Sequence, residues 1–256
     1  MTVGETHLRK SDKFKLEGFK WFTPNRQNAA MGGITTAVSE KHVGHSLKIG
    51  EGKNYEYLIT RHSDFVPALN IINLYGKQES RQTKEEIDIS WENVLNEIVE
   101  IEAGSENLLI VGDANCHIDS IVPGNNEKVS YAGRLLNNFL EGDKYTLVNA
   151  MNKTVGGPFT FYDRSDSDNN EKKLLLDIVI VSSILTQYID KFEIHSKLEW
   201  TPCRSDKGNI KYTDPFSLLL MMKNIPMRKS SYPTVTKNIV WNTKKKDGWT
   251  KYRSKI

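Results

Sequence analysis

The chain has 256 residues, of which 38% are hydrophobic and 26% charged. This composition suits one large soluble domain or two small ones, and no apolar run approaches the ~20 residues that a membrane-spanning helix requires. The first residues lack the apolar segment of a signal peptide, so we expect an intracellular protein. Two cysteines, Cys116 and Cys203, are too few for a disulfide framework or a four-thiolate zinc site.

The formal net charge of +3 is unevenly distributed along the chain. Residues 223–256 contain ten Lys or Arg and one acid, a net charge of +9, whereas residues 1–222 contain 25 basic and 31 acidic residues, a net charge of −6. An acidic body suits the binding of a divalent cation. A basic tail that also carries Trp241, Trp249 and Tyr252 suits a polyanion such as nucleic acid, and a solvated linker is the alternative interpretation.

The first half of the chain predicts a sheet followed by a helix. A helix is predicted from Thr83, because Thr83 and Glu86 fit a capping box and apolar residues then recur at helical spacing up to Gly104. A second amphipathic helix, over residues 135–140, ends at Gly142. The strands predicted before the first helix are Lys20–Thr23, Gly32–Val38, Tyr55–Thr60 and Ala68–Leu74.

The segment Asn107–His117 contains an apolar strand that ends in polar residues. Leu108–Val111 can be buried on both faces, and Gly112 allows the backbone to turn or to approach a neighbour closely. Asp113 and Asn115 follow, and polar groups at strand ends are where layered folds place their sites. By itself this pattern is more typical of an Asx turn after a strand, and it is the flanking sequence that favours a site.

The second half of the chain predicts further strands and one unusual acid. The run Leu174–Val181 is interrupted only by Asp177, and a carboxylate in a buried strand must be paired or hydrogen-bonded. We therefore expect Asp177 at an open strand end or beside a partner. The polar run Asp163–Lys173 predicts a hairpin loop. The other strands predicted here are Tyr145–Val148, Phe159–Tyr162, Phe192–His195 and Phe216–Met222.

Five short motifs in this order resemble the endonuclease/exonuclease/phosphatase superfamily, most closely the apurinic-type endonuclease domain of non-LTR retrotransposons and their domesticated relatives. The resemblance covers residues 3 to about 224. Each motif is weak alone, but five in the family's order make chance unlikely. The motifs are Gly4-Glu5-Thr6-His7, Asn73-Leu74-Tyr75, Gly112-Asp113-Ala114-Asn115, Leu176-Asp177 and Thr213-Asp214.

The resemblance implies an α+β, DNase-like fold for residues 1–222: a four-layer sandwich of two mostly antiparallel sheets packed face to face, with helices outside. Residues 223–256 resemble the basic linker that joins such an endonuclease to a reverse transcriptase. The implied activity is phosphodiester hydrolysis with Mg²⁺, or Mn²⁺, that nicks DNA, which would place the protein in the nucleus. Hard carboxylate oxygens are the ligands that Mg²⁺ prefers.

The resemblance also implies a role for each motif residue. Glu5 and Asp214 would bind the metal. Asp113 would orient or deprotonate the attacking water, Asn115 would hold a phosphate oxygen, and Tyr75 would contact the phosphate. These assignments are expectations carried over from the family, position by position.

Two departures from the family pattern bear on activity. The family has a histidine that donates to the phosphate and is held by the carboxylate matching Asp177, and here Pro215 occupies its position. We also expect the family's first strand, which carries an Asn near the metal, to be missing, because the sequence starts at Met1. Impaired cleavage is the expected result, and the alternative is a catalytically inactive remnant or scaffold that binds nucleic acid. A lipid or sugar phosphatase of the same superfamily fits the motif wording less well.

Overall fold

The structure is a computed structural model, and its description covers only part of the chain. The described residues are 2–3, 17–23, 33–42, 44–51, 55–78, 82–102, 107–118, 128–156, 159–163, 172–195, 203–204, 210–211 and 217–228. Two short pairs lie apart from the layers described below, namely β14 (Cys203–Arg204) with β15 (Ile210–Lys211) and the hairpin formed by β10 (Phe161–Asp163) and β11 (Lys172–Leu174). None of the helices in these ranges is long and apolar enough to cross a membrane.

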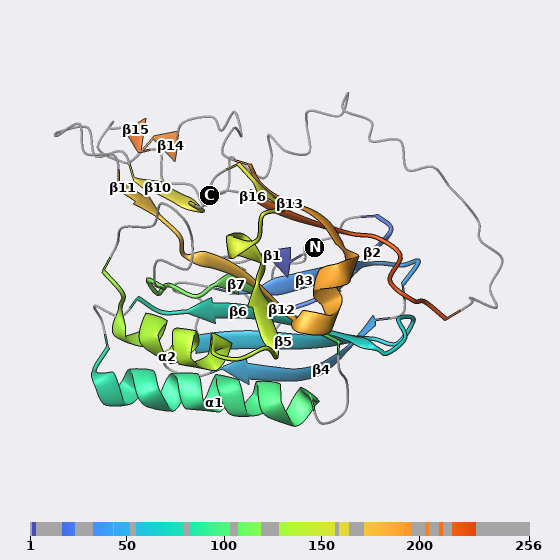
Figure 1. The fold of residues 1–256 in the computed structure, drawn as a ribbon, viewed down its shortest axis with the longest axis horizontal. Coiled ribbons are helices and arrows are strands. Elements are labelled where there is room, and N and C mark those ends of the chain that lie inside the picture. Colours follow the sequence, from blue (N-terminus) through green and yellow to red (C-terminus); the bar gives the residue numbers. More distant parts are fainter. Residues whose placement is uncertain are drawn as a thin grey trace.

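A six-stranded sheet forms the centre of the molecule (Figure 1). In this sheet all neighbouring strands are antiparallel except β6 (Leu69–Gly76) and β7 (Asn107–Asp113), which run parallel and are joined through the helix α1 (Lys84–Glu102). A parallel pair needs such a crossover because its strands start at the same end of the sheet. In spatial order the strands are β4 (Gly44–Glu51), β5 (Tyr55–His62), β6 (Leu69–Gly76), β7 (Asn107–Asp113), β12 (Asp177–Ser182) and β8 (Tyr145–Leu147).

Two helices, α1 (Lys84–Glu102) and α2 (Tyr131–Leu140), cover one face of this sheet (Figure 1). The predicted capping box is confirmed, because the Glu86 backbone N–H donates to Thr83 Oγ1 at 3.2 Å and the Thr83 N–H donates to Glu86 Oε2 at 2.9 Å. At the start of α2, Ser130 Oγ accepts a hydrogen bond from the Gly133 N–H at 3.1 Å, an N-cap without the reciprocal bond. The core between helices and sheet includes Ile72, Leu74, Ile87, Val94, Ile110, Leu136 and Ile178.

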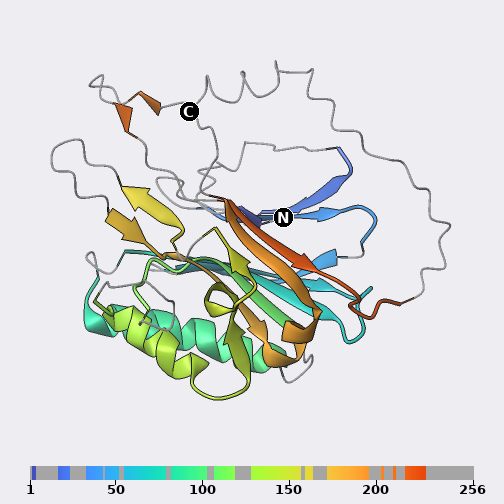
Figure 2. The same cartoon turned by 45° about the horizontal axis from the view of Figure 1, so that its top comes forward.

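Two smaller sheets pack on the opposite face of the central sheet (Figure 2). Ile34 packs against Leu58 and Tyr75 under the first small sheet, and Phe192 packs with Val179 under the second. The α+β, DNase-like sandwich predicted from the sequence is thereby confirmed. The first small sheet has the order β1 (Thr2–Val3), β3 (Thr35–Ser39), β2 (Phe19–Phe22), and the second has the order β16 (Ser217–Met222), β13 (Ile189–His195), β9 (Thr154–Val155).

The prediction of one strand over Leu174–Val181 is wrong in one respect. The segment belongs to two strands, because β11 ends at Leu174 and β12 begins at Asp177. The buried hydroxyl of Thr160 accepts hydrogen bonds from the backbone N–H groups of Leu176 and Asp177, at 3.0 and 2.9 Å. These two N–H groups are therefore bonded to a side chain. Strand β12 begins at Asp177 as a result, and the predicted hairpin is confirmed as the β10–β11 pair. Short 3-10 helices follow β8 (η2, Val148–Ala150) and β12 (η3, Ser183–Tyr188).

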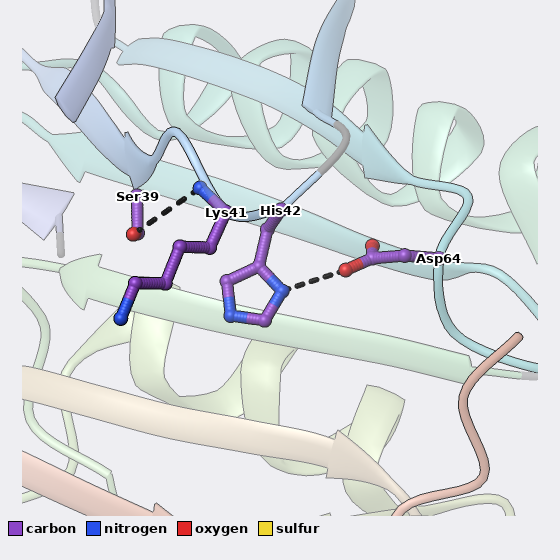
Figure 3. A network of polar contacts seen from close by, with 4 residues as sticks. All are labelled: Ser39, Lys41, His42 and Asp64. Atoms are coloured by element: carbon purple, nitrogen blue, oxygen red, sulfur yellow. Dashed lines mark hydrogen bonds and ion pairs between the residues drawn. The ribbon is translucent and has the colours of Figure 1, made fainter. Parts of the chain in front are cut away.

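The residues after β16 are attached to the end of the central sheet where β5 ends and β6 begins. The Val66 N–H donates to Pro226 O at 2.8 Å, and the Arg228 N–H donates to Asp64 O at 2.7 Å. The Asp64 carboxylate also accepts a 2.6 Å hydrogen bond from His42 Nδ1, while the Lys41 N–H donates to Ser39 Oγ in the same turn (Figure 3). Residues 223–228, which the sequence assigned to a linker, thus contact the folded body.

Gly112 allows strands β6 and β7 to pair closely at the end of β7. Its φ is +146°, and a Cβ at this position would lie 1.9 Å from the carbonyl oxygen of Leu74, its partner on β6. The Leu74 carbonyl is part of the backbone, so it cannot move aside as the end of a flexible side chain can. The glycine before Asp113 is therefore required by the approach of two strands as well as by its own backbone conformation.

We predict that Gly112→Ala lowers the free energy of unfolding by about 3 kcal/mol, because the strands must separate to accept the methyl group. The matched control is Gly142→Ala: Gly142 also has a positive φ, +103°, but no atom lies within 4 Å of the place that its new methyl group would take. This control should lose only about 1 kcal/mol from backbone strain. Urea unfolding followed by circular dichroism measures both, and equal losses would contradict the steric explanation.

Candidate active site

Four polar side chains lie in one row across four neighbouring strands of the central sheet. The register pairs Glu56 on β5 with Tyr75 on β6, Tyr75 with Asp113 on β7, and Asp113 with Asp177 on β12. Residues paired across adjacent strands project from the same face. Tyr75 packs against Ile34 of the opposing layer, so the whole row faces the smaller sheets.

The row lies at one end of the sheet. Strand β7 ends at Asp113, β12 begins at Asp177, and β6 ends one residue after Tyr75. With strands about 4.8 Å apart, the row from Glu56 to Asp177 spans about 14 Å. The structure thus brings together three of the residues that the sequence singled out, and it adds Glu56 to them.

The carboxylate of Asp113 is held by its neighbour Asn115. Asp113 Oδ1 accepts from the Asn115 backbone N–H at 2.8 Å, and Oδ2 accepts from Asn115 Nδ2 at 2.9 Å. Asn115 has a left-handed φ of +46°, which Asn tolerates better than most residues. The predicted Asx turn is therefore part of the candidate site, and both carboxylate oxygens of Asp113 accept hydrogen bonds from Asn115.

Asn115 also links β7 to the end of β6. Its Nδ2 donates to the carbonyl oxygen of Gly76 at 2.7 Å in addition to Asp113. An amide nitrogen carries two hydrogens, and both bonds go to protein acceptors. In this arrangement Asn115 positions Asp113. The phosphate contact expected for Asn115 stays a prediction, and it requires one of these two hydrogens to be redirected.

Asp177 is placed by two buried polar side chains that sequence reasoning missed. The hydroxyl of Thr160 accepts from the Asp177 N–H, as described above. The side chain of Asn149 makes two hydrogen bonds to the backbone of β12: its Nδ2 donates to Asp177 O at 3.2 Å, and its Oδ1 accepts from the Val179 N–H at 2.8 Å. Thr160 is 0% and Asn149 3% exposed. Nothing in their local sequence distinguishes them from surface polar residues, so only the fold identifies them.

Tyr75 is largely buried, with 9% of its surface exposed. Its ring packs with Ile34 and Leu58, while Phe22 lies against the same cluster. This packing fixes the ring beside Asp113. The expected contact between Tyr75 and phosphate stays a prediction.

Glu56 and Asn73 attach the smaller sheet to the row. The Glu56 carboxylate, 4% exposed, accepts a hydrogen bond from the Gly33 N–H at 3.1 Å, and Asn73 Nδ2 donates to Thr35 O at 2.9 Å. Both bonds hold the start of β3 over Tyr75, so these side chains act as positioning residues. The sequence signal for Glu56 was an acid flanked by two aromatic residues in a predicted strand, as Tyr55-Glu56-Tyr57.

The two expected metal ligands, Glu5 and Asp214, and the unusual Pro215 lie outside the described residues. Within the described part of the chain, no group of three or more His, Cys, Asp or Glu side chains could hold a metal ion. Asp113 and Asp177 do contribute neighbouring carboxylates, and like charges directly opposite on paired strands are unfavourable without compensation. Their hard oxygen atoms are of the type that suits Mg²⁺.

Comparison with known proteins places this geometry in a known fold. No protein-family model and no curated protein matches the sequence. Among solved structures, the endonuclease domain of TRAS1, a telomere-specific non-LTR retrotransposon, is 13% identical with a TM-score of 0.54, and 82% of each chain is covered. The 3′ phosphatase NExo from Neisseria, a variant bound to a product DNA hairpin, is 17% identical with a TM-score of 0.61, covering 86% of this chain and 87% of NExo.

A third similar structure is described as a member of the endonuclease/exonuclease/phosphatase family. An endonuclease/exonuclease/phosphatase family protein from Bacteroides thetaiotaomicron is 12% identical with a TM-score of 0.51, covering 80% of this chain and 73% of that one. Identities this low are informative about the fold and not about the reaction. The chain has the fold of the endonuclease/exonuclease/phosphatase superfamily, as its motifs predicted.

Proposed function

We propose that this protein hydrolyses phosphodiester bonds in DNA with the help of Mg²⁺, as a retrotransposon-type endonuclease domain. The observation that carries the proposal is the row in which Tyr75, Asp113 and Asp177 meet at one end of the central sheet. Their order along the chain is that of the superfamily motifs. DNA is favoured as the substrate because one similar structure is a retrotransposon endonuclease domain and another is bound to a DNA hairpin.

In the proposed reaction, water adds to the phosphorus, one P–O ester bond breaks, and the leaving oxygen takes a proton from solvent water. Asp113 receives the proton of that water, and Asn115 keeps its carboxylate aimed at the site through two hydrogen bonds. Glu5 and Asp214 would hold Mg²⁺, or Mn²⁺, which neutralises the charge that develops on the phosphate oxygens. Tyr75, whose ring packs against Ile34 and Leu58, would contact the phosphate. A reverse transcriptase domain in the parent polyprotein would be the natural partner.

The alternative proposal is a nuclease fold that binds nucleic acid without cutting it. Pro215 favours this alternative, because proline at the position of the family histidine offers no side-chain donor to the phosphate. Removing one donor that stabilises a transition state typically costs about 10² to 10³ in rate. We therefore propose slow cleavage for the natural sequence.

We predict that Asp113→Asn lowers the rate of supercoiled-plasmid nicking in Mg²⁺ by about 10² or more, since a neutral amide cannot accept the proton. Asp143→Asn is the matched control: this exposed aspartate lies outside the row and should leave the rate unchanged. Nicking that survives in Asp113→Asn at the natural rate would contradict the assignment, and a natural protein without any nicking would favour the inactive alternative.

We predict that Pro215→His raises the nicking rate by about 10², because it restores an oriented donor beside the phosphate. Asp177→Ala in the same background should remove much of the gain if this carboxylate holds the new imidazole. Thermal unfolding checks that both variants remain folded. A Pro215→His protein that cuts no faster than the natural one would show that position 215 does not occupy the histidine position.

A further inference from the structure

A groove with an apolar floor and an acidic rim runs between α1 and α2, on the side of the central sheet away from the row. Its floor is formed by Trp91 and Leu95 of α1 with Leu135 and Phe139 of α2, and its rim includes Asp88 and Glu92. The groove has a volume of about 460 Å³. That is within the usual size of a binding cleft.

The groove continues along α1 as an apolar and acidic strip. Val99 follows Leu95 by four residues, which places it on the same helix face, and 55% of its surface is exposed. The sequence of α1 contains seven acidic residues and one lysine, a net charge of −6. Two of these acids, Asp88 and Glu92, line the groove, and a helix that combines exposed apolar surface with this much negative charge suits a partner that is both apolar and basic.

Two of the cations near the groove lie at its Asp88 end, and a third, Lys144, lies over the Tyr145 ring that stacks on Phe139. The Tyr131 hydroxyl donates to Asp88 Oδ2 at 3.0 Å, and this hydrogen bond to a carboxylate raises the pKa of Tyr131. Lys84 and Arg134 lie over the Tyr131 ring, 5.5 and 5.2 Å from its centroid. The exposed carboxylate of Glu92 lies one turn further along α1, on the rim.

The chain itself contains a segment of the complementary composition. Residues 229–256, which lie outside the described part of the chain, contain eight Lys or Arg and one acid. They include the apolar run Ile239-Val240-Trp241 between Lys237 and Lys244-Lys245-Lys246. This run lies 11 to 13 residues beyond Arg228, a stretch that spans at most about 45 Å when extended. That length exceeds the ~28 Å of the 19-residue helix α1, along which the groove runs.

We propose that residues 229–256 dock in the groove between α1 and α2 of the same molecule. Ile239-Val240-Trp241 covers the apolar floor, and the flanking lysines pair with the rim at Glu92. The docking does not depend on the proposed nuclease activity. Because the same lysines are those available to DNA phosphates, docking and DNA binding compete for them, and the body restrains the tail until a polyanion displaces it.

Zero-length carbodiimide cross-linking of the full chain, followed by peptide mass spectrometry, tests this contact directly. We expect cross-links within one molecule between Glu92 and the lysines at 237 and 244–246. The matched variants are Glu92→Lys and Glu100→Lys. Both glutamates are exposed on α1 and both substitutions change the charge equally, but only Glu92 lines the groove. Helix content from circular dichroism checks that each variant is folded.

Trypsin cleavage within residues 229–256, mapped by mass spectrometry, gives the second readout. Glu92→Lys should speed cleavage there about fivefold, as expected for reversing one exposed ion-pair partner, and Glu100→Lys should not. A Val240→Ser, Trp241→Ser double variant should speed it as well. Equal acceleration by both glutamate variants would overturn the proposal in favour of general charge attraction. Cross-links found only between molecules would assign the groove to a second copy, and protection seen only with added DNA would assign the tail to DNA alone.

Discussion

The parallel pairing of β6 with β7 is the constraint on which the candidate site depends. In a sheet whose other ladders are antiparallel, this one pair makes Tyr75 and Asp113 finish at the same end. The antiparallel return of β12 then brings Asp177, its first residue, beside Asp113. The pairing is possible because Gly112 leaves room for the Leu74 carbonyl and because α1 provides the crossover.

Buried polar side chains then fix the details that the ladders leave open. Thr160 accepts the backbone N–H of Asp177, so that β12 starts at this residue. Asn149 donates to the Asp177 carbonyl. Glu56 accepts from the Gly33 N–H and so connects the first small sheet to the row. Each such bond contributes about 1 kcal/mol net, but leaving its buried partner unsatisfied costs more. Their role is therefore to define a geometry more than to add stability.

The sequence predicted the parts of this structure that depend on local patterns. The capping box at Thr83, the apolar strand before Asp113 and the hairpin around residues 163–173 follow from spacing and turn chemistry alone. The cost of burying a charge limited Asp177 to an open strand end or a place beside a partner, and the structure puts it at a strand end. These are short-range signals, and the structure reproduces them.

Other features could not be predicted because they join residues far apart in the chain. Glu56 meets Gly33 across 23 positions, and Asn115 reaches Gly76 across 39. Strand β4 has few β-branched or aromatic residues, and it is defined by its pairing with β5. The groove between α1 and α2 likewise exists only after packing. The metal assignment to Glu5 and Asp214 rests on the motifs, since both lie outside the described residues.

The central claim is that Asp113 and Asp177 serve one reacting centre in phosphodiester hydrolysis, Asp113 as the base and Asp177 as the carboxylate that holds a histidine restored at position 215. A double-mutant cycle with Asp113→Asn, Asp177→Asn and the combined variant in the Pro215→His background, measured by the rate of plasmid nicking in Mg²⁺, tests it most directly. Residues that serve one reacting centre are strongly non-additive, so the combined variant should be little slower than Asp113→Asn alone. Losses that simply multiply would contradict the account and make the two carboxylates independent.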